Sequence, residues 1–319
     1  MKKILFVGSI NSSFIKNDYE GLKKYFDVRL YKHKFLDTLG NVIWCDTVFG
    51  WFASYRMILP TLFAKILNKK IVVVAGGYDV VNAPEIDYGA FARTPDKWIS
   101  RFVFKHADVI LPVSKYIANE LLEKDVINYC KTELKIIYNG VDLNKFYPYG
   151  DKSDKVAITV GEINWNNLSR KGIKSFVEAA QFLPDTQFVV IGEFKDDAID
   201  YLKSIATDNV HFTGFISNEE LLTWYQVAKV YVQPSYHEGF GLSVAEAMLC
   251  ECIPVTSNKG ALSEVTGKKG VPFNRPKLLA TAIKYAQQDS STTDIRGRLR
   301  IIINFSLQKR IERLKEILE

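Results

Sequence analysis

The feature that most restricts the fold is a series of short apolar runs separated by segments of helical length. The runs are rich in Val, Ile and Leu and nearly continuous, which is typical of strands buried on both faces of a parallel sheet. Alternation of such strands with helices predicts a doubly wound α/β domain. In the first half the runs lie at residues 4–7, 28–31, 42–44, 71–75, 109–113 and 135–138, and the helical segments lie at 18–26, 55–68, 97–106 and 115–124.

The pattern restarts after a polar stretch at 148–154, which we interpret as a linker. A chain of 319 residues is long enough for two domains. We therefore predict two Rossmann-like domains, 1–150 and 151–304, which face a central cleft at the carboxyl ends of their strands. A charged amphipathic helix at 305–319 is expected to pack back on the first domain. In the second half the runs lie at 156–160, 188–191, 210–212, 230–233 and 253–256, and the helical segments at 173–182, 198–205, 219–227 and 243–250.

Composition excludes several classes of protein. Hydrophobic residues make up 47% and charged residues 24%, which is ordinary for a soluble enzyme. No apolar run reaches the 18 or so residues of a membrane span, and the run at 4–7 is too short for a signal peptide. Four cysteines, Cys45, Cys130, Cys250 and Cys252, lack the spacing of a zinc site or a disulfide scaffold. We expect reduced thiols in a cytoplasmic protein.

The formal charge of +6 is concentrated in the first half. Residues 1–150 carry 21 Lys and Arg against 15 Asp and Glu, and the remainder carries 21 against 21. A basic half can attract an anionic lipid surface or an acidic acceptor, although an ordinary solvated surface explains the excess equally well. The segment 55–70 mixes apolar residues with Arg56, Lys65, Lys69 and Lys70, and Pro60 interrupts it. It fits either peripheral membrane contact or a helix packed on the sheet. No nucleic-acid partner is expected.

The segment 235–248, SYHEGFGLSVAEAM, holds the densest set of candidate binding residues. Its glycines let backbone amides approach a ligand closely, and a helix starting near Ser243 would point N–H groups and its positive dipole end at an anion such as a pyrophosphate. Glu238 and Glu246 can address two ends of an extended ligand. Ser243 and Glu246 also fit a capping box, which would explain Glu246 but not Glu238 or the Gly-Phe-Gly turn.

This segment resembles the E-x7-E motif of retaining glycosyltransferases. The run PSYHEGFGLSVAEAM, followed by CIPVTSNKGALSEV, is similar to glycosyltransferase family 4. Three further runs fall in the family's order: IIYNGVDLNKFYP, RKGIKSFVEAA and HFTGFISNEELLTWY. The resemblance covers residues 109–265 and is weaker before them. It implies a two-domain GT-B fold and a retaining hexosyltransferase. A nucleotide-diphospho-sugar would be its co-substrate, with no separate cofactor, and a glycan, lipid or small molecule would be its acceptor.

The resemblance also implies roles for the motif residues. Glu238 would contact hydroxyls of the transferred sugar, and Glu246 would contact ribose hydroxyls. The backbone around the turn would hold the sugar and the diphosphate, through Gly239, Phe240, Gly241, Leu242 and Ser243.

A basic pair on the diphosphate is the next implied feature. Lys171 matches the family's lysine. The family's arginine normally follows the glycine of the first strand, but here Glu162 follows Gly161. Arg170 is our candidate replacement, because a guanidinium can bind phosphate bidentately from a nearby position. A solvated loop charge is the alternative for Arg170.

Other residues are weaker candidates. Gly192, Phe215 and Tyr225 can line a nucleobase site, although either aromatic residue fits a core position as well. At the ends of first-half strands, Gly8 and Ser9 are expected to face the cleft. Asp79 is expected to contact the acceptor or the sugar, or else to cap a turn. The histidines His33 and His106 are interpreted as structural or surface residues.

No metal site is predicted. Cleavage of a nucleotide-diphospho-sugar develops negative charge on the leaving phosphate, which fixed cations and helix N–H groups can stabilise in place of a metal. Asp196 and Asp197 are adjacent and are expected to lead a helix rather than bind a cation. Two alternatives share the architecture: a nucleotide-sugar-binding protein that has lost turnover, and a sugar-nucleotide epimerase.

Overall fold

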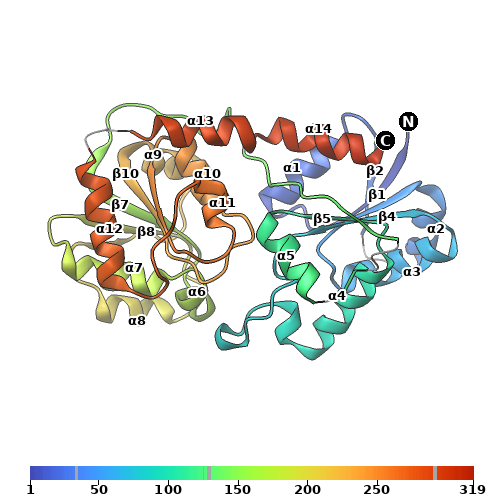
Figure 1. Cartoon of the computed structure of the whole chain (residues 1–319), viewed down its shortest axis with the longest axis horizontal. Coiled ribbons are helices and arrows are strands. Elements are labelled where there is room, and N and C mark those ends of the chain that lie inside the picture. The colour runs from blue at the N-terminus through green and yellow to red at the C-terminus, as the bar shows by residue number, and fades with distance from the viewer. Residues whose placement is uncertain (33–34, 125, 128–130, 290–292) are drawn as a thin grey trace. The chain divides into compact units, whose positions relative to one another are not determined.

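The computed structural model describes residues 1–32, 35–124, 126–127, 131–289 and 293–319. The chain forms two compact units (Figure 1): Met1–Gly140 with Leu307–Glu319, and Val141–Ser306. The boundary thus precedes the expected linker at 148–154. That stretch lies inside the second unit, whose first strand begins at Ser153. The expectations for His33 and Cys130 fall outside the described residues.

The first unit is built on a parallel sheet with the strand order β2-β1-β3-β4-β5-β6. Two predicted strands differ from the structure: the run at 135–138 follows β6, which consists of Glu133–Leu134, and the run at 42–44 is helical. The run at 42–44 ends helix α2, in which Val42 is buried and Ile43 is exposed, and the strand starts at Thr47. Three apolar residues are too few to distinguish a strand from a helical turn. The strands are β1 (Lys3–Val7), β2 (Asp27–Leu30), β3 (Thr47–Trp51), β4 (Lys70–Ala75), β5 (Val109–Pro112) and β6 (Glu133–Leu134).

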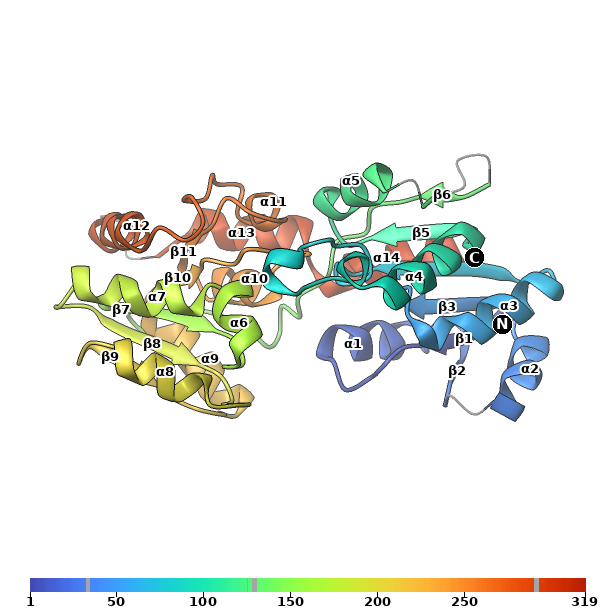
Figure 2. The same cartoon turned by 90° about the horizontal axis from the view of Figure 1, so that it is seen from below.

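Five of the described helices of this unit fall into two groups by their contacts, and α5 packs on β5. α1 packs on α14, and α3 packs on both α2 and α4 (Figure 2). The predicted C-terminal helix is α14, and it belongs to the first unit. The helices are α1 (Ser13–Leu22), α2 (Phe35–Trp44), α3 (Ile58–Ile66), α4 (Thr94–His106), α5 (Lys115–Glu123) and α14 (Leu307–Leu318).

A buried ion pair joins α14 to α1. The Arg310 guanidinium donates from Nε and Nη2 to the two carboxylate oxygens of Asp18, each at 2.7 Å. Its Nη1 donates to the carbonyl oxygens of Ile137 and Tyr138, and Trp51 Nε1 donates to Asp18 at 2.9 Å. Removing one partner would leave a buried charge uncompensated, so this pair fixes where α14 docks.

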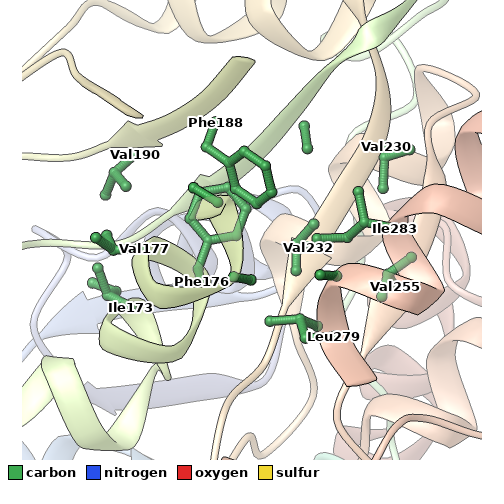
Figure 3. Packing of buried hydrophobic residues seen from close by; sticks show 14 of the residues in the cluster. Ile173, Phe176, Val177, Phe188, Val190, Val230, Val232, Val255, Leu279 and Ile283 are labelled. Atoms are coloured by element: carbon green, nitrogen blue, oxygen red, sulfur yellow. The ribbon is translucent and has the colours of Figure 1, made fainter. Parts of the chain in front are cut away.

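The second unit contains a parallel sheet with the order β11-β10-β7-β8-β9, and all five predicted runs form its strands. On one face, Phe176 of α7 and Phe188 of β8 pack with ring centroids 5.0 Å apart, beside Leu279 and Ile283 of α12 (Figure 3). The prediction of two Rossmann-like α/β domains is confirmed. The strands are β7 (Ser153–Val160), β8 (Gln187–Ile191), β9 (Val210–Phe212), β10 (Ala228–Gln233) and β11 (Ile253–Thr256).

The helices of the second unit connect these strands. Because the strands are parallel, their carboxyl ends meet at one edge of the sheet, where the connecting loops begin. The helices are α6 (Trp165–Arg170), α7 (Ile173–Ala179), α8 (Ala198–Ile205), α9 (Asn218–Val227), α10 (Leu242–Leu249), α11 (Leu262–Thr266), α12 (Pro276–Gln288) and α13 (Ile295–Asn304).

Candidate functional site

The candidate site lies at the carboxyl ends of β7, β8 and β10. Gly161 follows β7 and Gly192 follows β8, and a Cβ atom on Gly192 would lie only 2.1 Å from the Gly161 carbonyl oxygen. Gly192 is therefore required by the close approach of these two segments, whatever binds beside them. A loop of residues 234–241, here called the motif loop, joins β10 to α10.

An ion pair links the motif loop to the end of α6. Lys171 Nζ lies 2.5 Å from Glu238 Oε1, although the two residues are 67 positions apart in the chain. The Lys171 side chain is 18% exposed and that of Glu238 12%. The structure thus brings together two predicted site residues, in a position that solvent still reaches.

The electrostatics of this pair keep Glu238 ionised. Burial alone would raise the pKa of the Glu238 carboxyl, but the charges of Lys171 and Arg170 outweigh burial and hold that pKa below its usual value. Glu238 is consequently a hydrogen-bond acceptor throughout the neutral pH range.

Two buried polar residues of β10 lie beneath this pair. Tyr231 donates its hydroxyl to Gln233 Oε1 at 2.7 Å, and Gln233 Nε2 donates to Ser235 Oγ at 2.9 Å and lies 3.5 Å from Glu238 Oε1. Sequence reasoning missed both residues. The available signal was a glutamine at the end of an otherwise apolar strand, where a buried amide must find partners.

Arg170 also lies at this site. Its Nε and Nη2 donate to Asn167 Oδ1 at 3.1 and 2.6 Å, and its charge is one of those that lower the pKa of Glu238. Arg170 is therefore oriented by a neighbouring side chain, and it contributes positive potential beside Lys171.

The start of α10 overturns the capping-box alternative. Gly241 occupies the N-cap position with φ of 96°, and no side chain caps the helix. Ser243 is consequently the second residue of α10 rather than its N-cap, so Glu246 cannot complete a capping box with it. The first-turn N–H groups of α10 lie directly after the motif loop, which is where an anion-binding helix end would place them.

Glu246 has a different partner. Tyr225, which is fully buried, donates its hydroxyl to Glu246 Oε2 at 3.2 Å. Burial raises the pKa of Glu246 to about 7, against the opposing influence of the Tyr225 hydrogen bond and of Lys145 and Lys171. Tyr225 is thus a core residue that orients Glu246 rather than a residue that lines a base site.

The remaining motif residues contribute mainly backbone. Phe240 is buried and packs edge to face on Phe305, with ring centroids 5.4 Å apart. Only the main chain of Gly239, Phe240 and Gly241 can therefore serve a ligand here. Phe215, by contrast, follows β9 and is 78% exposed, so its ring is accessible for stacking.

The predicted residues of the first unit occupy its own strand ends. Gly8 is buried after β1, and Ser9 is partly buried. Asp79 is almost fully buried, and its carboxylate accepts N–H groups of Ala53, Gly76 and Gly77 at 3.0–3.1 Å. Burial raises the pKa of Asp79 to about 6 against these hydrogen bonds. The contacts favour the turn-capping alternative over direct contact with an acceptor or sugar.

Histidine, cysteine and acidic residues elsewhere have structural surroundings. The His106 ring nitrogen Nδ1 lies 2.7 Å from the Phe102 carbonyl oxygen, and Asp197 is the N-cap residue of α8, as expected. Cys45, Cys250 and Cys252 are free, buried thiols. Within the described ranges, no three His, Cys, Asp or Glu side chains gather to form a metal site. Every helix of the described residues is too short or too polar for a membrane span.

Comparisons with known proteins agree with this geometry. The family described as "Glycosyl transferases group 1" matches residues 147–300, which contain the ion pair and the motif loop. An uncharacterized glycosyltransferase of Methanocaldococcus jannaschii is 25% identical over 82% of this chain and 71% of its own length. The N,N'-diacetylbacillosaminyl-diphospho-undecaprenol alpha-1,3-N-acetylgalactosaminyltransferase of Campylobacter jejuni is 24% identical over 78% and 67%.

Solved structures show the same fold. HepE of Anabaena, solved in complex with UDP and glucose, superposes with a TM-score of 0.79 at 16% identity, over 100% of this chain and 99% of HepE. Sucrose-phosphate synthase from Thermosynechococcus elongatus superposes with a TM-score of 0.77 at 16% identity, over 99% and 98%. At such low identity these matches establish the two-domain architecture and not a substrate.

Proposed function

We propose a specific reaction for this chain, which is a glycosyltransferase with the GT-B fold and uses a nucleotide-sugar donor. It transfers a hexose-type sugar from a nucleotide-diphospho-sugar to an acceptor hydroxyl, with retention of anomeric configuration and without a metal ion or separate cofactor. The observation that carries this proposal is the Lys171–Glu238 pair of 2.5 Å, held where α10 begins.

Positive charge at this point suits the diphosphate. Lys171, Arg170 and the first-turn N–H groups of α10 would bind it, and the α10 dipole adds to their field. As the bond from the sugar C1 atom to the diphosphate oxygen breaks, negative charge grows on the leaving phosphate. Preorganised cations stabilise that charge more strongly in the transition state than in the ground state.

The two carboxylates suit the two ends of the donor. Glu238, ionised beside Lys171, would accept hydrogen bonds from sugar hydroxyls once Lys171 turns to the phosphate. Glu246 would accept hydrogen bonds from the ribose, and the exposed ring of Phe215 would stack on the base. The acceptor oxygen forms its bond to C1 on the face from which the diphosphate leaves, and the acceptor proton ends on that diphosphate. We propose that the first unit, with Gly8 and Ser9, binds the acceptor.

Turnover in the presence of a chelator tests the reaction. We expect the protein to release nucleoside diphosphate from a UDP- or GDP-hexose when an acceptor is present, and to do so in excess EDTA. NMR of the product should show the anomeric configuration of the donor. Activity that is lost in EDTA and restored by Mg²⁺ or Mn²⁺ would contradict the metal-free mechanism. Donor binding without any turnover would favour the binding-protein alternative, and C2 inversion of the free sugar nucleotide the epimerase.

We further propose that the enzyme works in the cytoplasm against an anionic membrane surface. The face formed by α2 and α3, here called the α2–α3 face, exposes Leu39, Ile43, Leu62 and Ile66, and Lys69 Nζ at its end lies 3.4 Å from the Ile43 carbonyl oxygen. Lysines beside exposed apolar side chains match an interfacial surface. The diphospho-undecaprenol named in the C. jejuni relative is a lipid-linked group of the kind such contact would present.

Vesicle binding tests this surface. Wild-type protein should co-sediment with vesicles containing phosphatidylglycerol, less so with pure phosphatidylcholine, and binding should weaken with added salt. Ile43→Glu should reduce the bound fraction several-fold. The control is Ile303→Glu in α13, because both isoleucines are 57% exposed. Equal loss in both variants, or binding that ignores lipid charge, would rule out the α2–α3 face.

A further inference from the structure

The backbone that carries Arg170 is attached to the motif loop. The amide of Tyr236 donates to the Arg170 carbonyl oxygen at 2.8 Å, and Ser235 Oγ donates to the Lys171 carbonyl oxygen at 3.4 Å. Both cationic side chains therefore start from main-chain points that are fixed relative to Glu238. For Lys171 the ion pair with Glu238 then sets the side-chain direction. Arg170 obtains its direction from Asn167.

Asn167 is buried and its amide group has only one consistent orientation. Its Nδ2 donates to the Glu162 carbonyl oxygen at 2.8 Å, so its Oδ1 faces Arg170 and accepts from Nε and Nη2 at 3.1 and 2.6 Å. The Asn167 backbone amide in turn donates to Asn164 Oδ1 at 2.9 Å, which is the N-cap bond of α6. A short helix thus presents one oriented amide oxygen to the guanidinium.

Glu162 occupies the position where the resemblance predicts an arginine. Its side chain is exposed, and its carboxylate lies 4.0 Å from Lys195 Nζ. Its backbone carbonyl, however, holds Asn167. The residue that departs from the expected pattern therefore supports the neighbouring cation through its main chain, which any residue type can do.

We infer that Asn167 is a positioning residue for the donor diphosphate, and that α6 with Asn167 and Arg170 replaces the arginine expected after Gly161. Asn167 fixes two of the guanidinium N–H groups and so preorganises the side chain. The inference rests on the proposed function and adds a residue that the resemblance does not supply. Preorganisation lowers the cost of reorientation when charge develops on the diphosphate.

A double-mutant cycle in single-turnover transfer tests the inference. Arg170→Ala should lower the rate by up to about 10²-fold, the range for one preorganised charge-stabilising group. Asn167→Ala should lower the rate by about tenfold, as expected for loss of one hydrogen-bond partner of a charged group. Asn166→Ala, at the exposed neighbouring position, should keep the parent rate. The double variant should lose much less than the product of the two single effects, because both act through one guanidinium.

Two further readouts separate a positioning role from a structural one. If Asn167 only stabilises α6, Asn167→Ala will lower the melting temperature and its rate effect will multiply fully with that of Arg170→Ala, which would overturn the inference. If Asn167→Ala fails to fold, Asn167→Asp serves in its place. The aspartate retains the side-chain shape and an acceptor for Arg170, and its carboxylate neutralises the charge of Arg170. We expect Asn167→Asp to weaken nucleoside diphosphate binding, and unchanged affinity would also overturn the inference. The Lys171→Ala variant distinguishes failure of this inference from failure of the proposed function. If the proposed function is wrong, Lys171→Ala will keep the parent rate.

Discussion

Lys171→Ala is expected to lower the single-turnover rate of transfer at saturating donor by about 10²-fold or more, the effect of removing one preorganised group that stabilises developing charge. Donor affinity should fall by a smaller factor, because the diphosphate gains charge only as the glycosidic bond breaks. The rate is measured by rapid mixing with labelled nucleotide-sugar, and donor affinity is measured by titration.

Lys174→Ala is the matched control for this variant. Lys174 lies three residues further on, is 44% exposed and pairs with Glu178 at 3.7 Å, away from Glu238. The Lys174→Ala variant should therefore turn over at the parent rate. Equal losses of rate in the two variants would show a general effect of removing a positive charge from this region. A parent rate for Lys171→Ala would mean that the diphosphate is held without this lysine, and the pair with Glu238 would then be structural.

The fold of the second unit follows closely from local sequence. Its five strands are three to eight residues long, each contains one of the predicted apolar runs, and all of them pair in parallel. The first unit contains the error at 42–44, where a short apolar run ends α2 and only Val42 of the run is buried. Periodicity cannot distinguish such a run from a strand without knowledge of what covers it.

The residue types of the candidate site could also be predicted from the sequence, but the contacts between them could not. The motif segment singled out Glu238 and Glu246, and the resemblance to family 4 glycosyltransferases added Lys171. Their contacts with each other and with Tyr225 span 21 to 67 residues, so they exist only once the sheet has assembled. Asn167 and Gln233 were missed for a different reason, because their contacts are local and span only two to five residues. An amide side chain reveals its role through its partners rather than through its position in a pattern.

The structure rules out one local alternative and favours one of the two roles left open for Asp79. The capping box required Ser243 to precede α10, but Gly241 takes that position with its positive φ and the helix starts one residue earlier than Ser243. Asp79 was expected either to contact the acceptor or sugar or to cap a turn, and three backbone amides that occupy its carboxylate favour the second role. Such a carboxylate stabilises the loop after β4 and has little capacity left for a substrate hydroxyl.

The pH dependence of nucleotide binding follows from the surroundings of Glu246. Burial raises its pKa to about 7, so the group is protonated below that pH and ionised above it. Ribose hydroxyls donate more strongly to a carboxylate than to a carboxylic acid. Affinity for a nucleoside diphosphate should therefore rise as the pH increases through about 7. Glu246→Gln cannot ionise, and its affinity should lack this rise.

Titration calorimetry of a nucleoside diphosphate into the wild type, Glu246→Gln and Glu251→Gln, at pH 6 and pH 8, tests the donor-site assignment directly. Glu251 follows α10 and pairs with Arg298 at 3.5 Å, so its variant controls for loss of a carboxylate nearby. We expect Glu246→Gln to bind about tenfold more weakly at pH 8, the effect of one charged hydrogen bond, while Glu251→Gln binds like the wild type. Wild-type affinity in Glu246→Gln at both pH values, with only the melting temperature changed, would show that Glu246 serves Tyr225 and not a nucleotide.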